Sequence, residues 1–246
     1  MVFGKVLSLF WISIFIHFVQ ITYAQSHQNF WSRATISLPI HKAIKVDLEY
    51  QNRRQNGFGN SNLLEKELME SIRVWLKYSL NNNVLLEISP FAYFQNHKII
   101  LEKSDEMDKP IKEYRLSAAI EQTNSLTKRL YWANKTGLDF RFFEQSSNNL
   151  IRVREKLYLK YELLKNWQIM LGDEILLNVT NASLAHLLDH NRLYLSSIYQ
   201  FSPVLKVELG YMKINRLQKF SMDLLNENNL ILNCTYTFKN IKKNRC

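Results

Sequence analysis

Apolar and polar residues alternate with a two-residue period through almost the whole chain, and this pattern limits the fold more than any other feature. It is clearest from Trp167 to Tyr211, where three successive segments repeat it. In the last segment, Leu205 and Val207 alternate with Lys206 and Glu208. Because successive side chains of a strand point to opposite faces, the pattern predicts strands with one apolar and one charged face.

The apolar face of such a sheet needs a covering. In a soluble β-sandwich a second sheet covers it, whereas in an outer-membrane barrel it meets lipid and the charged face lines the interior. The remaining features of the sequence decide between these two folds.

The first 24 residues have the features of a secretory signal peptide. Lys5 supplies a positive charge, an apolar run follows from Val6 to Val19, and Ala24 precedes a plausible cleavage site. We therefore expect a cleaved signal over residues 1–24 and a single barrel domain over residues 25–246. No later apolar run reaches the roughly 18 residues that a spanning helix needs, so any membrane insertion must use strands.

Charge and cysteine content exclude several classes of protein. Without Lys5, the chain carries 31 basic and 22 acidic residues, spread singly along the strands except for a basic tail at 239–245. The sequence contains no recognisable nucleic-acid-binding motif, so this charge does not predict nucleic-acid binding. The two cysteines, Cys234 and Cys246, are too few for a disulfide scaffold, and a structural zinc site lacks ligands.

The connections between candidate strands alternate in length. Short connections are expected at 39–42, 81–83, 122–129, 164–166 and 202–203, and long ones at 55–70, 96–111, 180–191 and 215–228. A medium loop is expected at 144–149, and Leu63 to Met69 could form a helical turn. Outer-membrane barrels have short periplasmic turns and longer outer loops, so this asymmetry favours a barrel over a sandwich.

Aromatic residues on the apolar face lie near the strand ends, as in the girdles of membrane barrels. Those near short turns are Tyr78, Tyr161, Trp167 and Phe201, and those near the opposite ends are Tyr50, Phe94, Phe142 and Tyr211. We therefore predict an all-β, antiparallel up-and-down transmembrane barrel of ten to twelve strands. Eleven candidate strands are visible, although bacterial barrels usually have an even number, and the place of Trp31–Leu38 stays open.

Several short motifs resemble one bacterial family. They are GDEILLN at 172–178, NRLYLS at 191–196, VELGY at 207–211 and RVREKLYLKY at 152–161. With the early Trp31 strand, they resemble an uncharacterised outer-membrane barrel family, the domain of unknown function 2490. The resemblance implies a barrel in the outer membrane and names no activity.

Charged residues on the inner face are the candidate site of the barrel. Glu174 and Arg192 are expected on neighbouring strands, and acids and bases in a narrow lumen should pair. The lumen ion-pair candidates are Glu174, Arg192, Arg154, Lys156, Glu208, Lys206, Glu49 and Arg73. Such a network could be a structural plug that fixes strand register or a path for a small anionic solute.

Two other constellations are weaker candidates. Ser183, His186 and His190 lie in one expected loop and suggest an esterase, and His186 and His190 with Asp189 suggest a metal site, but neither has a supporting signature. Asp173 interrupts the apolar face, and a bulge at the preceding glycine would turn it away from lipid. We therefore expect no catalytic residue, no metal and no cofactor.

The sequence thus predicts a non-enzymatic protein of the bacterial outer membrane, either structural or a narrow channel with an ion-paired lumen. The expected partners are outer-membrane lipid and the barrel-assembly machinery, without nucleic acid, and the oligomeric state is open. An outer-membrane lipid hydrolase and a soluble exported β-sandwich that binds a ligand are the alternatives.

Overall fold

A single closed β-barrel contains all the strands of the described chain. The computed structural model describes residues 25–144, 146–183, 186–217 and 224–239. The elements are β1 (Gln25–His41), β2 (Ile44–Gln55), β3 (Lys66–Ser79), β4 (Val84–Asn96), the short 3-10 helix η1 (Lys103–Met107), β5 (Ile111–Ser125), β6 (Leu130–Phe143), β7 (Ser146–Leu164), β8 (Trp167–Asn178), β9 (Leu188–Gln200), β10 (Leu205–Leu217) and β11 (Leu224–Thr237). In this described part, no helix has the length and apolarity to cross a membrane.

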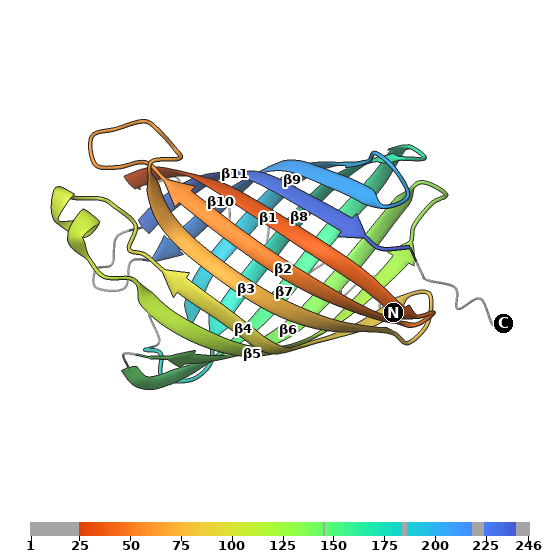
Figure 1. Ribbon diagram of the computed structural model, residues 1–246, viewed down its shortest axis with the longest axis horizontal. Helices are drawn as coiled ribbons and strands as arrows, with labels where there is room; N and C mark the ends of the chain where they lie inside the picture. The colour runs from red at the N-terminus through yellow and green to blue at the C-terminus, as the bar shows by residue number, and fades with distance from the viewer. Residues whose placement is uncertain (1–24, 145, 184–185, 218–223, 240–246) are drawn as a thin grey trace.

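Each strand pairs with its neighbours in sequence, and the first strand closes the barrel against the last (Figure 1). Ten of the eleven pairings are antiparallel, whereas β1 and β11 are parallel, with Phe30 opposite Leu230 and Ser37 opposite Thr237. The parallel pairing follows from the odd number of strands, because an up-and-down chain of eleven strands ends in the direction in which it began. The predicted Trp31–Leu38 strand is part of β1, so the expectation of an even number is wrong.

The predicted sorting of the connections is confirmed for the short turns and for three of the four expected long connections. The long connection expected at 215–228 is wrong in its bounds, because β10 continues to Leu217 and β11 begins at Leu224. Short connections at 42–43, 80–83, 126–129, 165–166 and 201–204 share one end of the barrel, which we call the short-turn rim. The connections at 56–65, 97–110 and 179–187 share the other end, the long-loop rim. Figure 1 shows strongly inclined strands between the two rims, with the β4–β5 connection and η1 beyond the long-loop rim.

Some strand ends differ from the sequence prediction. The β3 strand begins at Lys66, so the helical turn expected at Leu63–Met69 does not form. The β7 strand begins at Ser146, so the expected 144–149 loop contains little more than a turn. In both places strand pairing extends the ladder through polar residues that local composition assigns to a loop. The predicted signal peptide and most of the basic tail lie outside the described residues.

The alternating apolar residues face outward and no second layer covers them. Leu209 is 59% exposed, Leu195 54% and Ile88 54%, although all three lie in the middle of strands. A sandwich would bury these side chains against an opposing sheet. The sandwich alternative is therefore wrong.

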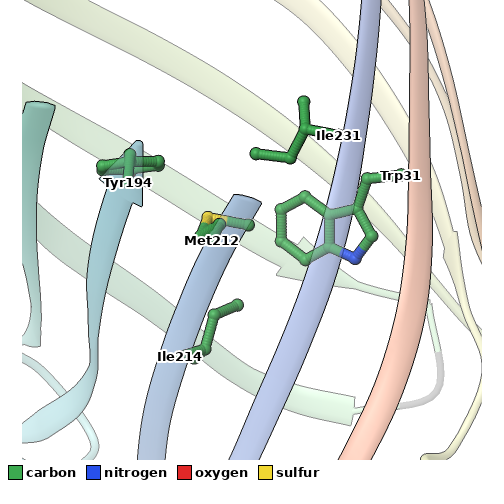
Figure 2. Packing of buried hydrophobic residues seen from close by; sticks show 5 residues of the cluster. All are labelled: Trp31, Tyr194, Met212, Ile214 and Ile231. Carbon is green, nitrogen blue, oxygen red and sulfur yellow. The ribbon is translucent and has the colours of Figure 1, made fainter. Parts of the chain in front are cut away.

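Apolar packing inside the barrel is confined to small clusters. One cluster joins Trp31 of β1, Tyr194 of β9, Met212 and Ile214 of β10, and Ile231 of β11 (Figure 2). Most of the remaining interior is polar, with buried carboxylates such as Glu113, Glu87 and Glu174. The barrel therefore has an apolar exterior and a charged interior, as the two-residue period predicts.

Candidate functional site

Glu174 of β8 is the centre of the ion-pair network in the lumen. Arg154 of β7 donates hydrogen bonds from Nε and Nη2 to its Oε1, at 2.9 and 2.6 Å. Arg192 of β9 donates to Oε2 at 3.2 Å, and the hydroxyl of Tyr194 donates to the same oxygen. Strand register explains the cluster, because Arg192 is directly opposite Glu174 and Arg154 is diagonal to it.

A second group links strands that are not neighbours. Arg73 of β3 lies 3.7 Å from Asp139 of β6, and Ser117 of β5 donates to Asp139 at 2.6 Å. Arg154 also reaches Asp139, at 3.6 Å, so this group joins the Glu174 cluster. Two strands separate β3 from β6, and side chains that meet across them show a narrow lumen at this level.

Further ion pairs continue the network toward both rims. Glu113 binds Arg115 and Arg141 near the long-loop rim, and both oxygens of its carboxylate accept hydrogen bonds. Glu87 binds Lys77 at 3.0 Å and also pairs with Lys135, nearer the short-turn rim. Together these pairs link side chains of β3, β4, β5 and β6.

The eight predicted lumen residues fall into three groups. Glu174, Arg192 and Arg154 come together as one cluster. Arg73 pairs with Asp139, whereas Glu49 pairs with Arg33 at 3.5 Å. Lys156, Lys206 and Glu208 face the lumen, but no opposite charge among the described residues lies within 4.0 Å of them; Glu208 accepts a hydrogen bond from Asn233 at 2.9 Å.

Several central residues were missed from the sequence. Asp139 and Glu87 alternate with outward apolar residues, so strand parity alone could have placed them in the lumen. Glu113, Lys135 and Arg53 have polar neighbours in sequence, so the local pattern marks their face less clearly. Their pairing partners could not have been found in this way, since many contacts cross the lumen between distant strands.

Apart from Lys45, which is exposed at the short-turn rim, four lumen cations have no carboxylate within 4.0 Å among the described residues: Arg53, Lys156, Lys160 and Lys206. We call them the uncompensated cations. Lys206 is the second residue of β10 at the short-turn rim, Lys160 and Lys156 follow along β7, and Arg53 is near the long-loop end of β2. They therefore extend from one rim toward the other.

Aromatic rings take the place of carboxylates beside three of these cations. The guanidinium of Arg53 lies 3.4 Å from the centroid of Trp31. The ammonium of Lys156 lies 4.5 Å from the ring of Tyr194, and that of Lys160 lies 4.8 Å from Tyr158. A ring face attracts a cation without neutralising its charge.

The alternative sites are only partly assembled. Ser183 Oγ and His186 Nδ1 are 2.9 Å apart on the exposed β8–β9 loop. His190 is separate, because its ring faces the lumen between Asp189, at 2.6 Å, and Arg192. Within the described ranges, no group of three or more histidine, cysteine, aspartate or glutamate residues is arranged to hold a metal ion.

Asp173 does not turn inward. It is opposite Leu157 on β7 and Leu193 on β9 in an uninterrupted register, so the bulge expected at Gly172 is absent. Gly172 instead leaves room for the Tyr158 side chain, since a Cβ at this position would lie 2.8 Å from the Tyr158 Cβ. Asp173 therefore stays on the outer face.

Comparisons with known proteins agree with this fold. The structure is similar to the NanC porin, with a TM-score of 0.51 and 12% identity, covering 81% of this chain and 92% of that one. It is more distantly similar to the outer-membrane OmpT of Vibrio cholerae, with a TM-score of 0.39 and 9% identity, covering 75% of this chain and 59% of that one. No curated protein matches the sequence. The family profile of DUF2490, described as a protein of unknown function, matches residues 28–221, so the chain belongs to the DUF2490 family.

Proposed function

We propose that this protein is a bacterial outer-membrane barrel whose narrow, basic lumen passes small anionic solutes. The observation that carries the proposal is the series of uncompensated cations from Lys206 to Arg53, in a lumen where most of the other charges are paired. The similarity to a porin supports the fold alone, and the anion path rests on the side chains of this chain.

The exterior supports insertion in lipid. The outward residues are mostly leucine, isoleucine and aromatic side chains, and Tyr161, Trp167 and Tyr199 form a girdle at the short-turn rim. In outer-membrane barrels the short turns face the periplasm and the long loops face outward. We propose this orientation here, with outer-membrane lipid and the barrel-assembly machinery as the partners.

The lumen supports selectivity for anions. Lining charges of one sign raise the local concentration of the opposite ion in a narrow pore and exclude ions of their own sign. The paired residues around Glu174 and Asp139 hold the wall, while the uncompensated cations supply the positive potential. Separate sites along the path also let a solute move from one cation to the next without being trapped at a single one.

Planar-bilayer recording tests this function. In a potassium chloride gradient, the reversal potential should show that chloride permeates more readily than potassium. Replacing Arg53, Lys156, Lys160 and Lys206 by glutamine should reduce this selectivity step by step. Lys128→Gln, in the exposed β5–β6 turn, makes the same charge change outside the lumen and should leave the reversal potential unchanged.

Two kinds of result would count against the anion path. Current with selectivity for cations, or selectivity unaffected by all four substitutions, would contradict an anion path. Absence of current in the folded protein would leave the ion-paired lumen with a structural role alone.

We propose no catalytic activity. The bond between Ser183 and His186 joins residues three positions apart on an exposed loop, whereas a nucleophile and its base need a rigid frame. Phospholipid hydrolysis by the purified barrel that disappears in Ser183→Ala would overturn this part of the proposal.

A further inference from the structure

Two buried hydrogen-bond donors lie on adjacent strands near the long-loop rim. Trp31 of β1 and Arg53 of β2 are directly opposite each other, and the guanidinium of Arg53 lies over the indole ring. Neither the indole Nε1 of Trp31 nor the Nε of Arg53 has a hydrogen-bond partner among the described residues. Buried N–H groups are nearly always paired, so these two donors mark a place for an acceptor.

The surroundings of these donors are positively charged. The guanidinium of Arg192 lies 5.6 Å from the centroid of the same Trp31 ring. Arg192 is paired with Glu174 at 3.2 Å, whereas Arg53 donates from Nη2 to the neutral amide oxygen of Gln51 at 3.4 Å. A charge remains beside Trp31 that a neutral acceptor would not balance, so the acceptor that fits this place best is an anion.

Apolar neighbours hold both donors in place. Figure 2 shows the Trp31 ring beside Met212 and Ile231, and Trp31 is 5% exposed. On the next strand, Met69 of β3 is directly opposite Arg53 and is 3% exposed. Packing of this kind positions the donors before a ligand arrives. It also excludes water, and an ionic interaction is stronger where water is excluded.

The geometry of the donors favours an oxyanion over a halide. A guanidinium holds its N–H groups in one plane, and two of them match two oxygens of a carboxylate or a phosphate. The indole N–H is a single directed donor, which suits a further lone pair on the same group. A chloride ion is spherical, so it gains little from donors that are fixed in direction.

We propose that Trp31 and Arg53 form a binding site for the oxyanion group of a small solute, a carboxylate or a phosphate. Arg192 adds positive charge beside the same ring. Arg53 is the third residue from the long-loop end of β2, so the site lies near the proposed outer mouth of the barrel. The inference rests on the proposed anion path for the arrival of the solute, and it narrows the solutes to those that carry an oxyanion.

Titration with inorganic phosphate and with sodium acetate tests the site. The indole N–H signals in the NMR spectrum of the folded protein are followed in uncharged detergent micelles, and Trp31→Phe identifies the signal of Trp31. At constant ionic strength in sodium chloride, we expect at least one of the two salts to shift this signal along a saturable curve. Arg53→Gln should weaken the binding about ten-fold, because a hydrogen bond to a charged group is lost. Arg129→Gln, the same change in the exposed β5–β6 turn, should leave it unchanged.

A lysine at position 53 separates geometry from charge. Arg53→Lys keeps the positive charge but replaces the planar fork with a single ammonium group, so it should also lose most of the binding. A heat-dependent gel shift identifies the variants that fold. A saturable shift with neither salt in the wild-type protein, or full binding in a folded Arg53→Gln or Arg53→Lys variant, would overturn the inference.

Chloride selectivity in planar bilayers separates this inference from the proposed function. A barrel that selects chloride over potassium but gives no saturable shift with either salt has an anion path without this site. A barrel that binds phosphate or acetate through Arg53 but carries no current has the site without the path.

Discussion

Glu174 illustrates how a single lumen residue controls its neighbours. Its carboxylate is 2% exposed and accepts hydrogen bonds from Arg154, Arg192 and Tyr194. Glu174→Ala leaves two arginines without this partner inside the barrel. We expect the free energy of unfolding to fall by about 3 kcal/mol, measured by urea unfolding in lipid vesicles.

Glu208 provides the control for this prediction. It also faces the lumen, but its hydrogen bond comes from the neutral amide of Asn233. Glu208→Ala should therefore cost about 1 kcal/mol. An equal or smaller loss for Glu174→Ala than for Glu208→Ala would show that the cluster does not stabilise the fold.

At this scale, parity along each strand placed part of the lumen charges. It put Glu174 and Arg192 on neighbouring strands, where the register sets them directly opposite each other, and it turned Arg154 inward without naming its partner. It could not pair Arg73 with Asp139, since that contact depends on how tightly the barrel closes. It also could not show that Lys156 and Lys206 have no carboxylate within 4.0 Å among the residues that the structure describes.

Among the strands, β8 and β10 depend on glycine for close packing. A Cβ at Gly172 would lie 2.8 Å from the Tyr158 Cβ and 3.1 Å from the Leu157 carbonyl oxygen. Gly172→Ala must therefore displace a neighbouring strand. We expect a loss of about 1–3 kcal/mol in the free energy of unfolding.

Gly137 of β6 is the matched control, because the nearest atoms to its added Cβ are 3.6 Å away, an ordinary contact. Gly137→Ala should leave stability unchanged or raise it slightly, since glycine weakens a strand through its backbone entropy. Equal effects at the two positions in urea titrations would contradict the packing argument.

The β4–β5 loop is held by charges outside the barrel wall. Burial of Asp105 would by itself raise the pKa of its carboxyl. Lys98, 2.6 Å away, and the backbone N–H groups of Leu101 and Glu102 outweigh this effect and lower the pKa. Hydrogen bonding to Asp105 and Asp108 also raises the pKa of Lys98.

This loop should loosen in acid. A carboxyl whose pKa is lowered by folding stabilises the folded loop above its ordinary pKa, and the effect is lost as the pH falls through the lowered value. We expect the amides of Leu101 and Glu102 to be protected from hydrogen exchange at neutral pH and to lose protection in strong acid, after correction for intrinsic rates. Asp105→Asn should already expose them at neutral pH, and retained protection would contradict this role.

The sequence predicts the strands better than their ends. The alternation of apolar and polar residues identifies all eleven strands, because each strand turns a polar face to the lumen and an apolar face outward. The beginnings of β3 and β7 were missed, since Lys66 and Ser146 are polar residues whose strand conformation depends on pairing with a neighbour. Such pairing is a tertiary effect that local composition does not contain.

For the molecule as a whole, the number of strands decides how the barrel closes. Eleven strands place Gln25 at the long-loop rim and Thr237 at the short-turn rim, beside Ser37. The sequence showed eleven candidates, but a general preference for even numbers argued against them. Only the parallel pairing of β1 with β11, over thirteen residue pairs, resolves this conflict.

The central claim is that hydrocarbon covers the outside of the barrel while water and charge occupy the inside. A nitroxide scan along β10, from Leu205 to Leu209 and in a background without cysteine, tests it most directly. In lipid vesicles, labels at 205, 207 and 209 should be relaxed by oxygen, which concentrates in lipid, and labels at 206 and 208 by a water-soluble nickel complex. Relaxation by the nickel complex at all five positions would contradict the account.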